Sequence, residues 1–344
     1  MAKQDLKNLE FKEVEKRVIS LGFPKFRAGQ IWDWLRRKEV KEIAAMKNLS
    51  PDIREMLEQQ FYISKINIKD KQESKVDGTK KLLFEFEDGV CVESVILPGE
   101  ERVSLCISSQ AGCALGCRFC ATGELGFIRD LTVGEIINEF EAAKAEAGGK
   151  IDSIVFMGMG EPFLNKENVL KAIDILSDAK GHNFSQTRIT VSTAGIVPVI
   201  KEIADSEYKF NLAISLITAD DNIRYKLMPI TKKYSLKEVI AAARYYNAKH
   251  KEPVMFEYIL LKGLNDSPDD ALKVLKLLKG LDYKINLIPY NSVSEKDYHK
   301  PAREVTLKFQ KVLVDAGVKA FIRREKGSDI AGACGQLAGK KEIQ

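Results

Sequence analysis

Apolar residues recur at helical spacing through the first sixty residues of the chain. A period of three to four predicts short amphipathic helices, each with one face turned to a core. Ser50-Pro51 adds a start signal, because serine caps a helix N-terminus and proline suits the first turn. We therefore predict three helices with apolar positions at Phe11, Val14, Val18 and Ile19, then Ile31, Trp32, Trp34 and Leu35, then Ile53 and Leu57.

Basic and aromatic residues are interleaved in the same segment. This mixture suits RNA, because cations pair with phosphates and aromatic rings stack on bases. The same mixture is equally expected of a small domain in which the aromatic residues form the core and the basic residues face the solvent. Both interpretations stay open for the bases Arg17, Lys25, Arg27, Arg36, Arg37 and Lys38 and for the aromatics Phe23, Phe26, Trp32 and Trp34.

The pattern then changes to alternation of apolar and polar residues on either side of Asp88-Gly89. Alternation predicts strands, and Asp-Gly is a strong hairpin turn, so we predict a hairpin over Lys81 to Glu87 and Val90 to Leu97.

From Val103 onward, short apolar runs alternate with amphipathic stretches, which predicts a parallel α/β sheet or barrel. The candidate strands are Val103 to Ser108, Ser153 to Met157, Arg188 to Ser192, Phe210 to Leu216, Val254 to Leu261, Ile285 to Pro289 and Val318 to Arg323. The candidate helices are Val133 to Ala147, Lys166 to Ser177, Leu236 to Lys249 and Asp269 to Leu278.

Composition is that of an ordinary soluble protein, with 344 residues, 45% of them hydrophobic, and a net charge of +5. This length can bury a large core in one main domain with an appendage. No apolar run has the length of a membrane span, and the start Met-Ala-Lys-Gln-Asp-Leu lacks the order of a secretory signal. We expect a cytoplasmic protein with no membrane partner. The mild basicity permits an RNA partner without demonstrating one.

Three cysteines, Cys113, Cys117 and Cys120, lie within one eight-residue loop. A [4Fe–4S] cube usually takes four thiolates, so a loop with three leaves one iron open to a small molecule. This spacing resembles the radical-SAM superfamily, in which S-adenosylmethionine occupies that iron and is cleaved to a radical. Zinc is the weaker alternative, because no second cysteine or histidine pair is present to complete a tetrahedral site.

Polar residues follow several of the predicted strands, where the carboxyl ends of parallel strands build active sites. Gly158-Met159-Gly160-Glu161 combines glycines that let a ligand approach the backbone with a carboxylate that can pair with an ammonium group. Ser192, Ser215 and Asn291 could bind hydroxyls or a carboxylate, although such residues are also common turn formers.

Two further cysteines, Cys106 and Cys334, stand outside the loop, and a barrel could bring both to its mouth. A pair of thiols there could act as nucleophile and resolving partner. The alternative is a buried strand thiol and a spare loop thiol. Cys91, in the hairpin, has only a structural interpretation.

Taken together, four segments resemble the RlmN-type dual-specificity rRNA and tRNA adenine-C2 methyltransferases of the radical-SAM superfamily. They are Cys106 to Gly123, Phe156 to Pro162, Ile285 to Asn291 and the Ala-Cys-Gly-Gln-Leu run at Ala333 to Leu337. The resemblance extends over nearly the whole chain, including the helical N-terminal segment.

The resemblance implies roles for individual residues. Cys113, Cys117 and Cys120 would hold one [4Fe–4S] cluster. S-Adenosylmethionine, two molecules per turnover, would contact Gly160, Glu161, Ser192, Ser215, Leu216, Ile217 and Asn291. Cys334 would carry a methyl group whose carbon, as a radical, adds to C2 of adenine; Glu93 would accept a proton, and Cys106 would release the product by forming a disulfide with Cys334.

The resemblance also implies the architecture and the partners. We expect a partial (β/α)6-type barrel at residues 101–340, a β-hairpin linker carrying Glu93 at 63–100, and a helical domain at 1–62 that docks RNA. The partners would be 23S rRNA, tRNA and an electron donor such as flavodoxin or ferredoxin. We expect a monomer.

Two departures from the family pattern stand near the expected site. Ile217 replaces the usual histidine of Ser-Leu-His, so any imidazole hydrogen bond is lost. Ala331-Gly332 replaces an acidic-Ala pair before the last cysteine, which removes a charge and adds backbone freedom.

Three other functions remain open at this stage. A Cfr-like enzyme would methylate C8 of the same ribosomal adenosine with the same cysteines. A radical-SAM activase or maturase would act on a protein. An iron–sulfur regulator would catalyse no reaction.

Overall fold

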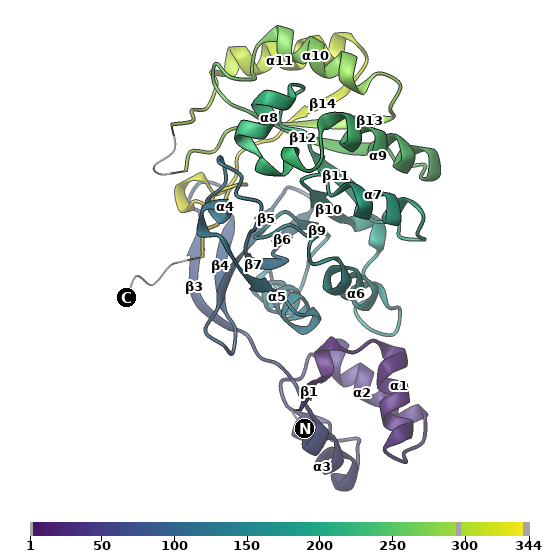
Figure 1. The fold of residues 1–344 in the computed structure, drawn as a ribbon. Coiled ribbons are helices and arrows are strands. Elements are labelled where there is room, and N and C mark those ends of the chain that lie inside the picture. Colours follow the sequence, from purple (N-terminus) through teal and green to yellow (C-terminus); the bar gives the residue numbers. More distant parts are fainter. Residues whose placement is uncertain (1–2, 294–296, 340–344) are drawn as a thin grey trace.

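The computed structural model describes residues 3–293 and 297–339. The first two residues of the predicted N-terminal domain, and residues 294–296 and 340 of the predicted catalytic domain, lie outside this range. One ten-stranded sheet dominates the fold, in the order β14-β13-β12-β11-β10-β9-β6-β5-β4-β3. Its two end strands, β14 and β3, are not paired with each other, so the sheet forms an open, partial barrel (Figure 1).

Seven neighbouring strands of this sheet run parallel, which confirms the predicted α/β class. They are β6 (Val103–Ile107), β9 (Ser153–Phe156), β10 (Ile189–Thr193), β11 (Asn211–Ser215), β12 (Val254–Leu260), β13 (Tyr283–Pro289) and β14 (Lys319–Ile322). Six helices follow the outer side of these strands (Figure 1): α5 (Val133–Glu146), α6 (Lys166–Ser177), α7 (Val197–Ala204), α9 (Leu236–Lys249), α10 (Pro268–Leu278) and α11 (Arg303–Asp315).

The predicted hairpin is part of the main sheet. Its strands β4 (Lys80–Glu85) and β5 (Cys91–Pro98) are joined by β3 (Asn67–Glu73), which the alternation did not reveal because almost all of β3 is exposed. β5 also pairs antiparallel with β6, with Val95 opposite Cys106. The sheet therefore continues from the barrel into the strand that carries Glu93.

The cysteine loop is bounded by short elements that the pattern did not predict. β7 (Gln110–Gly112) and β8 (Phe127–Asp130) form a two-stranded sheet at its base, and α4 (Ala121–Leu125) follows the last cysteine. A second short helix, α8 (Asp221–Leu227), follows β11. These elements have three to seven residues, too few for a periodic signal.

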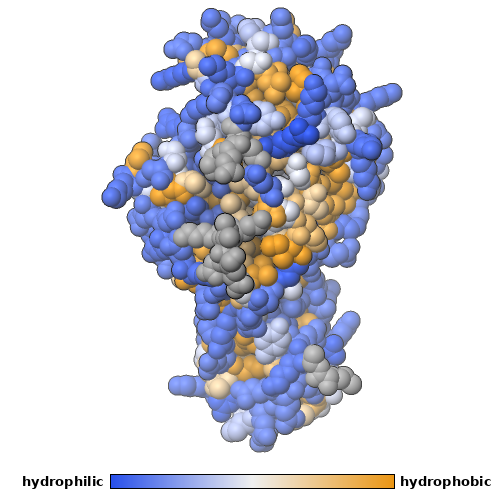
Figure 2. All heavy atoms as spheres, turned by 60° about the vertical axis from the view of Figure 1, so that its left-hand side comes forward, coloured by the Kyte–Doolittle hydropathy of each residue, from blue (hydrophilic) through white to orange (hydrophobic). Residues whose placement is uncertain are grey.

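The N-terminal helices form as predicted: α1 (Phe11–Ser20), α2 (Phe26–Arg36) and α3 (Pro51–Gln60), with a small parallel pair β1 (Gln4–Asp5) and β2 (Phe61–Tyr62). They lie at one end of the molecule, away from α11 (Figure 1). Trp32 is buried in the core, whereas Phe26 is 61% exposed. The core interpretation therefore holds for Trp32, and Phe26 remains available to a partner. Figure 2 shows mostly hydrophilic residues over this end of the molecule.

A buried ion pair joins the N-terminal segment to α5. Lys7 Nζ lies 2.5 Å from a Glu141 carboxylate oxygen, and both side chains are at most 1% exposed. Lys7 also donates to Asn138, and Arg36 donates to the backbone carbonyl of Lys7 at 2.9 Å. Charged groups removed from water need such partners, so this contact fixes where the small domain sits.

Among the helices of the described residues, none combines the length and the apolar character that a membrane span needs.

Candidate active site

The cysteine loop is a tightly held turn that leaves β7. The Cys113 N–H donates to the carbonyl of Gly126 at 2.8 Å, and the Cys120 N–H donates to the carbonyl of Cys117 at 3.1 Å. Gly112 has φ +72°, and a Cβ on it would lie 1.8 Å from the Gly126 oxygen. Only glycine fits this close approach, so the residue before Cys113 is dictated by the backbone of the loop.

The three thiols line one cavity together with Gly160, Glu161 and Ser215. Burial raises the pKa of Cys113 to about 12 and the pKa of Cys117 well above its ordinary value. Without a cation these thiols would stay protonated, and bound iron reverses that preference by its own charge. In the described ranges, no three His, Cys, Asp or Glu side chains converge as the ligands of one metal ion would. Three separated thiols around a cavity fit an iron–sulfur cluster, in which each thiolate binds a different iron.

Glu161 presents a buried carboxylate to this cavity. Its oxygens accept from the N–H groups of Phe163 at 3.0 Å and Ala194 at 2.7 Å. Burial outweighs these hydrogen bonds and raises the pKa of Glu161 to about 7. The neighbouring Gly160 has φ +98°, and a Cβ there would meet Gln110 at 2.5 Å. The site thus favours a cationic ligand that would keep the Glu161 carboxylate ionised.

The other predicted cofactor contacts divide into two groups. Ser192, Ser215 and Ile217 line the same cavity. Leu216 is fully buried and does not line this cavity; its N–H donates to the backbone carbonyl of Glu257 on β12 at 3.0 Å. Ile217 has φ +66°, a left-handed conformation that a β-branched residue adopts only under constraint. The residue that stands where the resemblance implies a histidine is therefore strained.

Arg224 on α8 is a site residue that the sequence did not reveal. Its side chain is completely buried and donates to the backbone carbonyls of Ala194 at 2.6 Å, Ser215 at 3.1 Å and Leu216 at 3.3 Å. Glu257 on β12 was missed as well; it is buried, lines the cavity, and has one carboxylate oxygen that forms no hydrogen bond with any described residue. A single arginine or glutamate outside a motif gives no signal in the sequence. The positions of these two residues beside the cavity are therefore known only from the fold.

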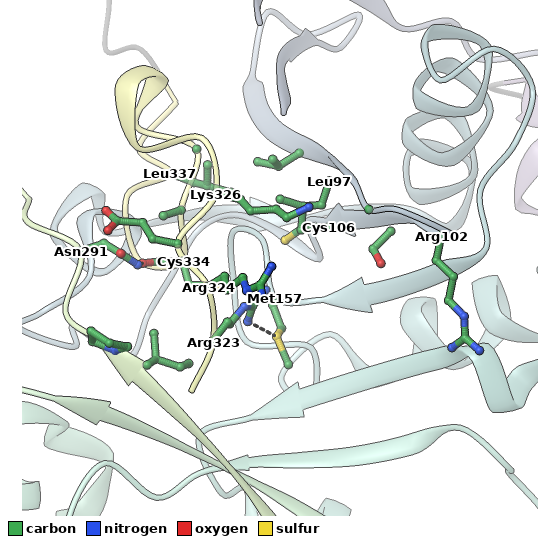
Figure 3. A pocket seen from close by; sticks show the side chains of 18 residues that line it. Leu97, Arg102, Cys106, Met157, Asn291, Arg323, Arg324, Lys326, Cys334 and Leu337 are labelled. Carbon is green, nitrogen blue, oxygen red and sulfur yellow. Dashed lines mark hydrogen bonds between the residues drawn. The ribbon is translucent and has the colours of Figure 1, made fainter. Parts of the chain in front are cut away.

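Cys106 and Cys334 line a second cavity of about 390 Å³, and Cys334 lines the first cavity as well. In Figure 3, Cys106 and Cys334 border this cavity from β6 and from the tail, and Arg323 contacts Met157 close by. Burial, and next the Cys334 sulfur, raise the pKa of Cys106 well above its ordinary value, while Arg323 opposes this. Neither cysteine forms a disulfide. The fold has brought together the two thiols that lie 228 residues apart in sequence.

The tail that carries Cys334 is fastened directly to the cysteine loop. The Ala121 N–H donates to the Gly335 carbonyl at 2.8 Å, and the Thr122 hydroxyl donates to the Leu337 carbonyl at 2.5 Å. Asn291 belongs to this region and not to the first cavity, because its side-chain amide donates to the Cys334 carbonyl at 3.2 Å. Asn291 therefore supports the tail in this conformation.

Glu93 lines neither of these two cavities. Its carboxylate forms an ion pair with Lys81 at 3.2 Å and accepts from the N–H groups of Ala338 at 2.8 Å and Gly339 at 3.2 Å. The structure thus places Glu93 against the tail just beyond Cys334.

Comparisons with known proteins agree with one another. Residues 107–278 match the family described as the Radical SAM superfamily, and residues 4–63 match the ribosomal RNA large subunit methyltransferase N-terminal domain. The chain is 43% identical over 340 residues to the dual-specificity RNA methyltransferase RlmN of Geotalea uraniireducens, covering 99% of this chain and 98% of that one. It is 44% identical to a probable RlmN of a Thermotoga species, covering 98% of each.

A solved structure supports the same relationship over the fold. A radical SAM methyltransferase from Sphaerobacter thermophilus superposes with a TM-score of 0.93 at 38% identity, covering 98% of this chain and all of the other. The chain belongs to the RlmN family of radical-SAM RNA methyltransferases.

Proposed function

We propose that this protein methylates C2 of an adenosine in 23S rRNA and of the anticodon-adjacent adenosine in tRNAs, through a methyl group carried on Cys334. One observation carries the proposal: Cys334 lines both the cavity with the three loop thiols and the neighbouring cavity, which opens beside Arg102, Arg324 and Lys326. A residue that borders both can pass a group from a cofactor in one to a nucleotide in the other. The second cavity has the volume of a small-molecule site.

Within the first cavity, Cys113, Cys117 and Cys120 would hold one [4Fe–4S] cluster, and the carboxylate of Glu161 would pair with the ammonium group of S-adenosylmethionine. When bound, the cluster and two S-adenosylmethionine molecules per turnover would supply the methyl group and the radical. Ser192, Ser215 and the backbone of Leu216 and Ile217 would orient the cofactor. Asn291 would contribute from the segment that carries Cys334, whose carbonyl accepts a hydrogen bond from the Asn291 amide.

The protein's own chemistry would then involve three side chains. One C–H bond of the methyl group on Cys334 would lose its hydrogen atom to the radical derived from S-adenosylmethionine, and the carbon would then bond to C2 of adenine. Glu93 would take the proton that leaves C2, and the remaining unpaired electron would return to the cluster. Cys106, as a thiolate, attacks the Cys334 sulfur; the sulfur–carbon bond breaks, its electron pair leaves with carbon, and a proton completes the new methyl group. The two cysteines end as a disulfide. Because Glu93 is held by the backbone of residues 338 and 339, the tail has to shift before Glu93 reaches the base.

The RNA would be bound by shape, with the target base extruded into the second cavity. Arg102, Arg324 and Lys326 at its rim suit the flanking phosphates. We assign RNA docking to the helical segment at 1–62, where Phe26 is exposed beside Arg27. We propose a cytoplasmic monomer reduced by a flavodoxin or ferredoxin, since thiolate clusters need a reducing compartment.

The test is methylation of 23S rRNA and tRNA by the anaerobically reconstituted protein, followed by mapping of the methyl group on the digested nucleosides. We expect 2-methyladenosine in both RNAs. Methylation at C8 would support the Cfr-like alternative instead. Cleavage of S-adenosylmethionine without any RNA product would point to an activase that acts on a protein.

Replacing Glu161 with glutamine should weaken S-adenosylmethionine binding by about tenfold to a hundredfold, since a charge-assisted hydrogen bond contributes roughly 1.5–3 kcal/mol. Because the pKa of the Glu161 carboxyl is about 7, this binding should depend on pH. Below pH 7 the carboxyl is mostly protonated and loses its attraction for the ammonium group. Wild-type affinity, measured by equilibrium binding, should therefore fall between pH 8 and pH 6. The Glu161→Gln affinity should change far less over that range, and an equal change in both proteins would contradict the assignment.

A further inference from the structure

Arg224 ties together the loops that border the first cavity. Its guanidinium donates to carbonyls at the ends of two different strands: Ala194, directly after β10, and Ser215 and Leu216, the last residue of β11 and the one after it. A fourth hydrogen bond, at 3.0 Å, goes to the Thr231 hydroxyl. Two adjacent strand ends are thus held to one rigid group, which fixes the width of the cavity between them.

Backbone hydrogen bonds connect Arg224 to residues proposed to bind S-adenosylmethionine. The Ala194 carbonyl accepts from Arg224, while the Ala194 N–H donates to the Glu161 carboxylate. Ser215, whose carbonyl also accepts from Arg224, lines the cavity with its side chain. A displaced Arg224 would therefore move both the carboxylate and the serine.

Arg224 also places a buried positive charge behind the cysteine loop. Within the described residues, its four hydrogen bonds go to neutral acceptors, three carbonyls and one hydroxyl. Asp221, and Cys117 once its thiolate binds the cluster, are the groups whose negative charge would raise the pKa of Arg224. α8 itself touches the loop, because the Arg118 N–H donates to the Leu227 carbonyl at 2.9 Å. Burial lowers the pKa of Arg224 to about 10, so it remains charged at pH 7.

We propose that Arg224 is a positioning residue with two separable effects: its hydrogen bonds set the geometry of the S-adenosylmethionine site, and its charge raises the reduction potential of the bound cluster. A cluster gains negative charge on reduction, so a buried cation nearby favours the reduced form. This inference rests on the proposed function only in requiring the cluster and S-adenosylmethionine in the first cavity.

Two substitutions separate these effects. Arg224→Met removes both the charge and the donors, whereas Arg224→Lys keeps a charge but cannot reach three carbonyls in fixed directions. Lys226→Met, on the exposed side of the same helix, removes an equal charge as the control. The readouts are the cluster's midpoint potential, followed by electron paramagnetic resonance, and equilibrium binding of S-adenosylmethionine. Both are measured without RNA on preparations matched for iron content.

For Arg224→Met we expect the ratio of reduced to oxidised cluster at a fixed potential to fall about tenfold, which is 59 mV for one electron, and S-adenosylmethionine affinity to fall about tenfold. For Arg224→Lys the affinity should fall while the potential stays near that of the wild type. Lys226→Met should change neither.

The inference is overturned if Arg224→Met retains both wild-type values, or if Arg224→Lys binds S-adenosylmethionine as tightly as the wild type. Should Arg224→Met fail to fold, Arg224→Lys alone decides: lost affinity with an unchanged potential supports the inference, and a lowered potential contradicts the role of the charge. A wild-type protein that leaves RNA unmodified would refute the proposed function without affecting these measurements.

Discussion

Replacing Cys334 with alanine is expected to reduce RNA methylation by at least about a thousandfold, because the residue that carries the transferred carbon is lost. The cluster should remain, since its three proposed ligands lie in a separate loop. The measurement is methyl incorporation into 23S rRNA and tRNA, with the iron content and visible spectrum of each preparation recorded alongside.

Cys91→Ala provides the matched control. Cys91 lies on β5, outside both cavities that contain Cys334, so its replacement should leave methylation near the wild-type rate. If Cys334→Ala still methylated adenosine at more than a few per cent of that rate, the carrier mechanism would be wrong. An activase or an iron–sulfur regulator should be indifferent to both substitutions.

Replacing Lys7 with methionine should destabilise the protein by about 3–5 kcal/mol, the usual cost of leaving one member of a buried ion pair without its partner. Lys7 and Glu141 are both almost completely buried. The remaining carboxylate would face His182 at 3.5 Å as its nearest buried base. The thermal unfolding midpoint should drop by roughly five degrees, and the N-terminal helices should become accessible to protease first.

The matched variant replaces both partners, as Lys7→Met with Glu141→Leu. Removing both charges leaves no buried carboxylate unpaired, so much of the lost stability should return. If the double variant is no more stable than Lys7→Met, the loss comes from packing and not from the unpaired charge.

The pH dependence of this ion pair has a definite sign. Burial alone would raise the pKa of Glu141, but Lys7 and His182 outweigh it and hold the pKa at about 2. The pKa of Glu141 in the folded protein lies below its value in the unfolded chain, about 4.3. The ionised Glu141 therefore contributes its full stabilisation of the fold above about pH 4.3. It is lost as the pH falls from about 4.3 towards 2.

Periodicity alone predicted most of the fold. The helices α6 and α9 begin and end at the predicted residues, because a long amphipathic face leaves a clear signal. The strand β3 and the small sheet around the cysteine loop were missed, since an exposed edge strand and three-residue strands have no distinct pattern. The pairing of β5 with β6 was not predicted, because local alternation does not reveal which strands are neighbours in a sheet.

The sequence predicted those residues of the candidate site that belong to recognisable motifs. The three loop thiols, Gly160 and Glu161 share one cavity, as strand-end reasoning predicted. Arg224 was missed because a single arginine on a seven-residue helix looks like a surface residue in sequence. The tail contacts of Glu93 were also unpredictable, because they join backbone groups 245 residues or more away in the chain.

The most direct test of the central claim is mass analysis of the reconstituted protein after incubation with S-adenosylmethionine and before any RNA is added. We predict one methyl group on the peptide that contains Cys334 and none on Cys106 or Cys91. An unmethylated Cys334 in a preparation that nevertheless methylates C2 of adenosine would contradict it.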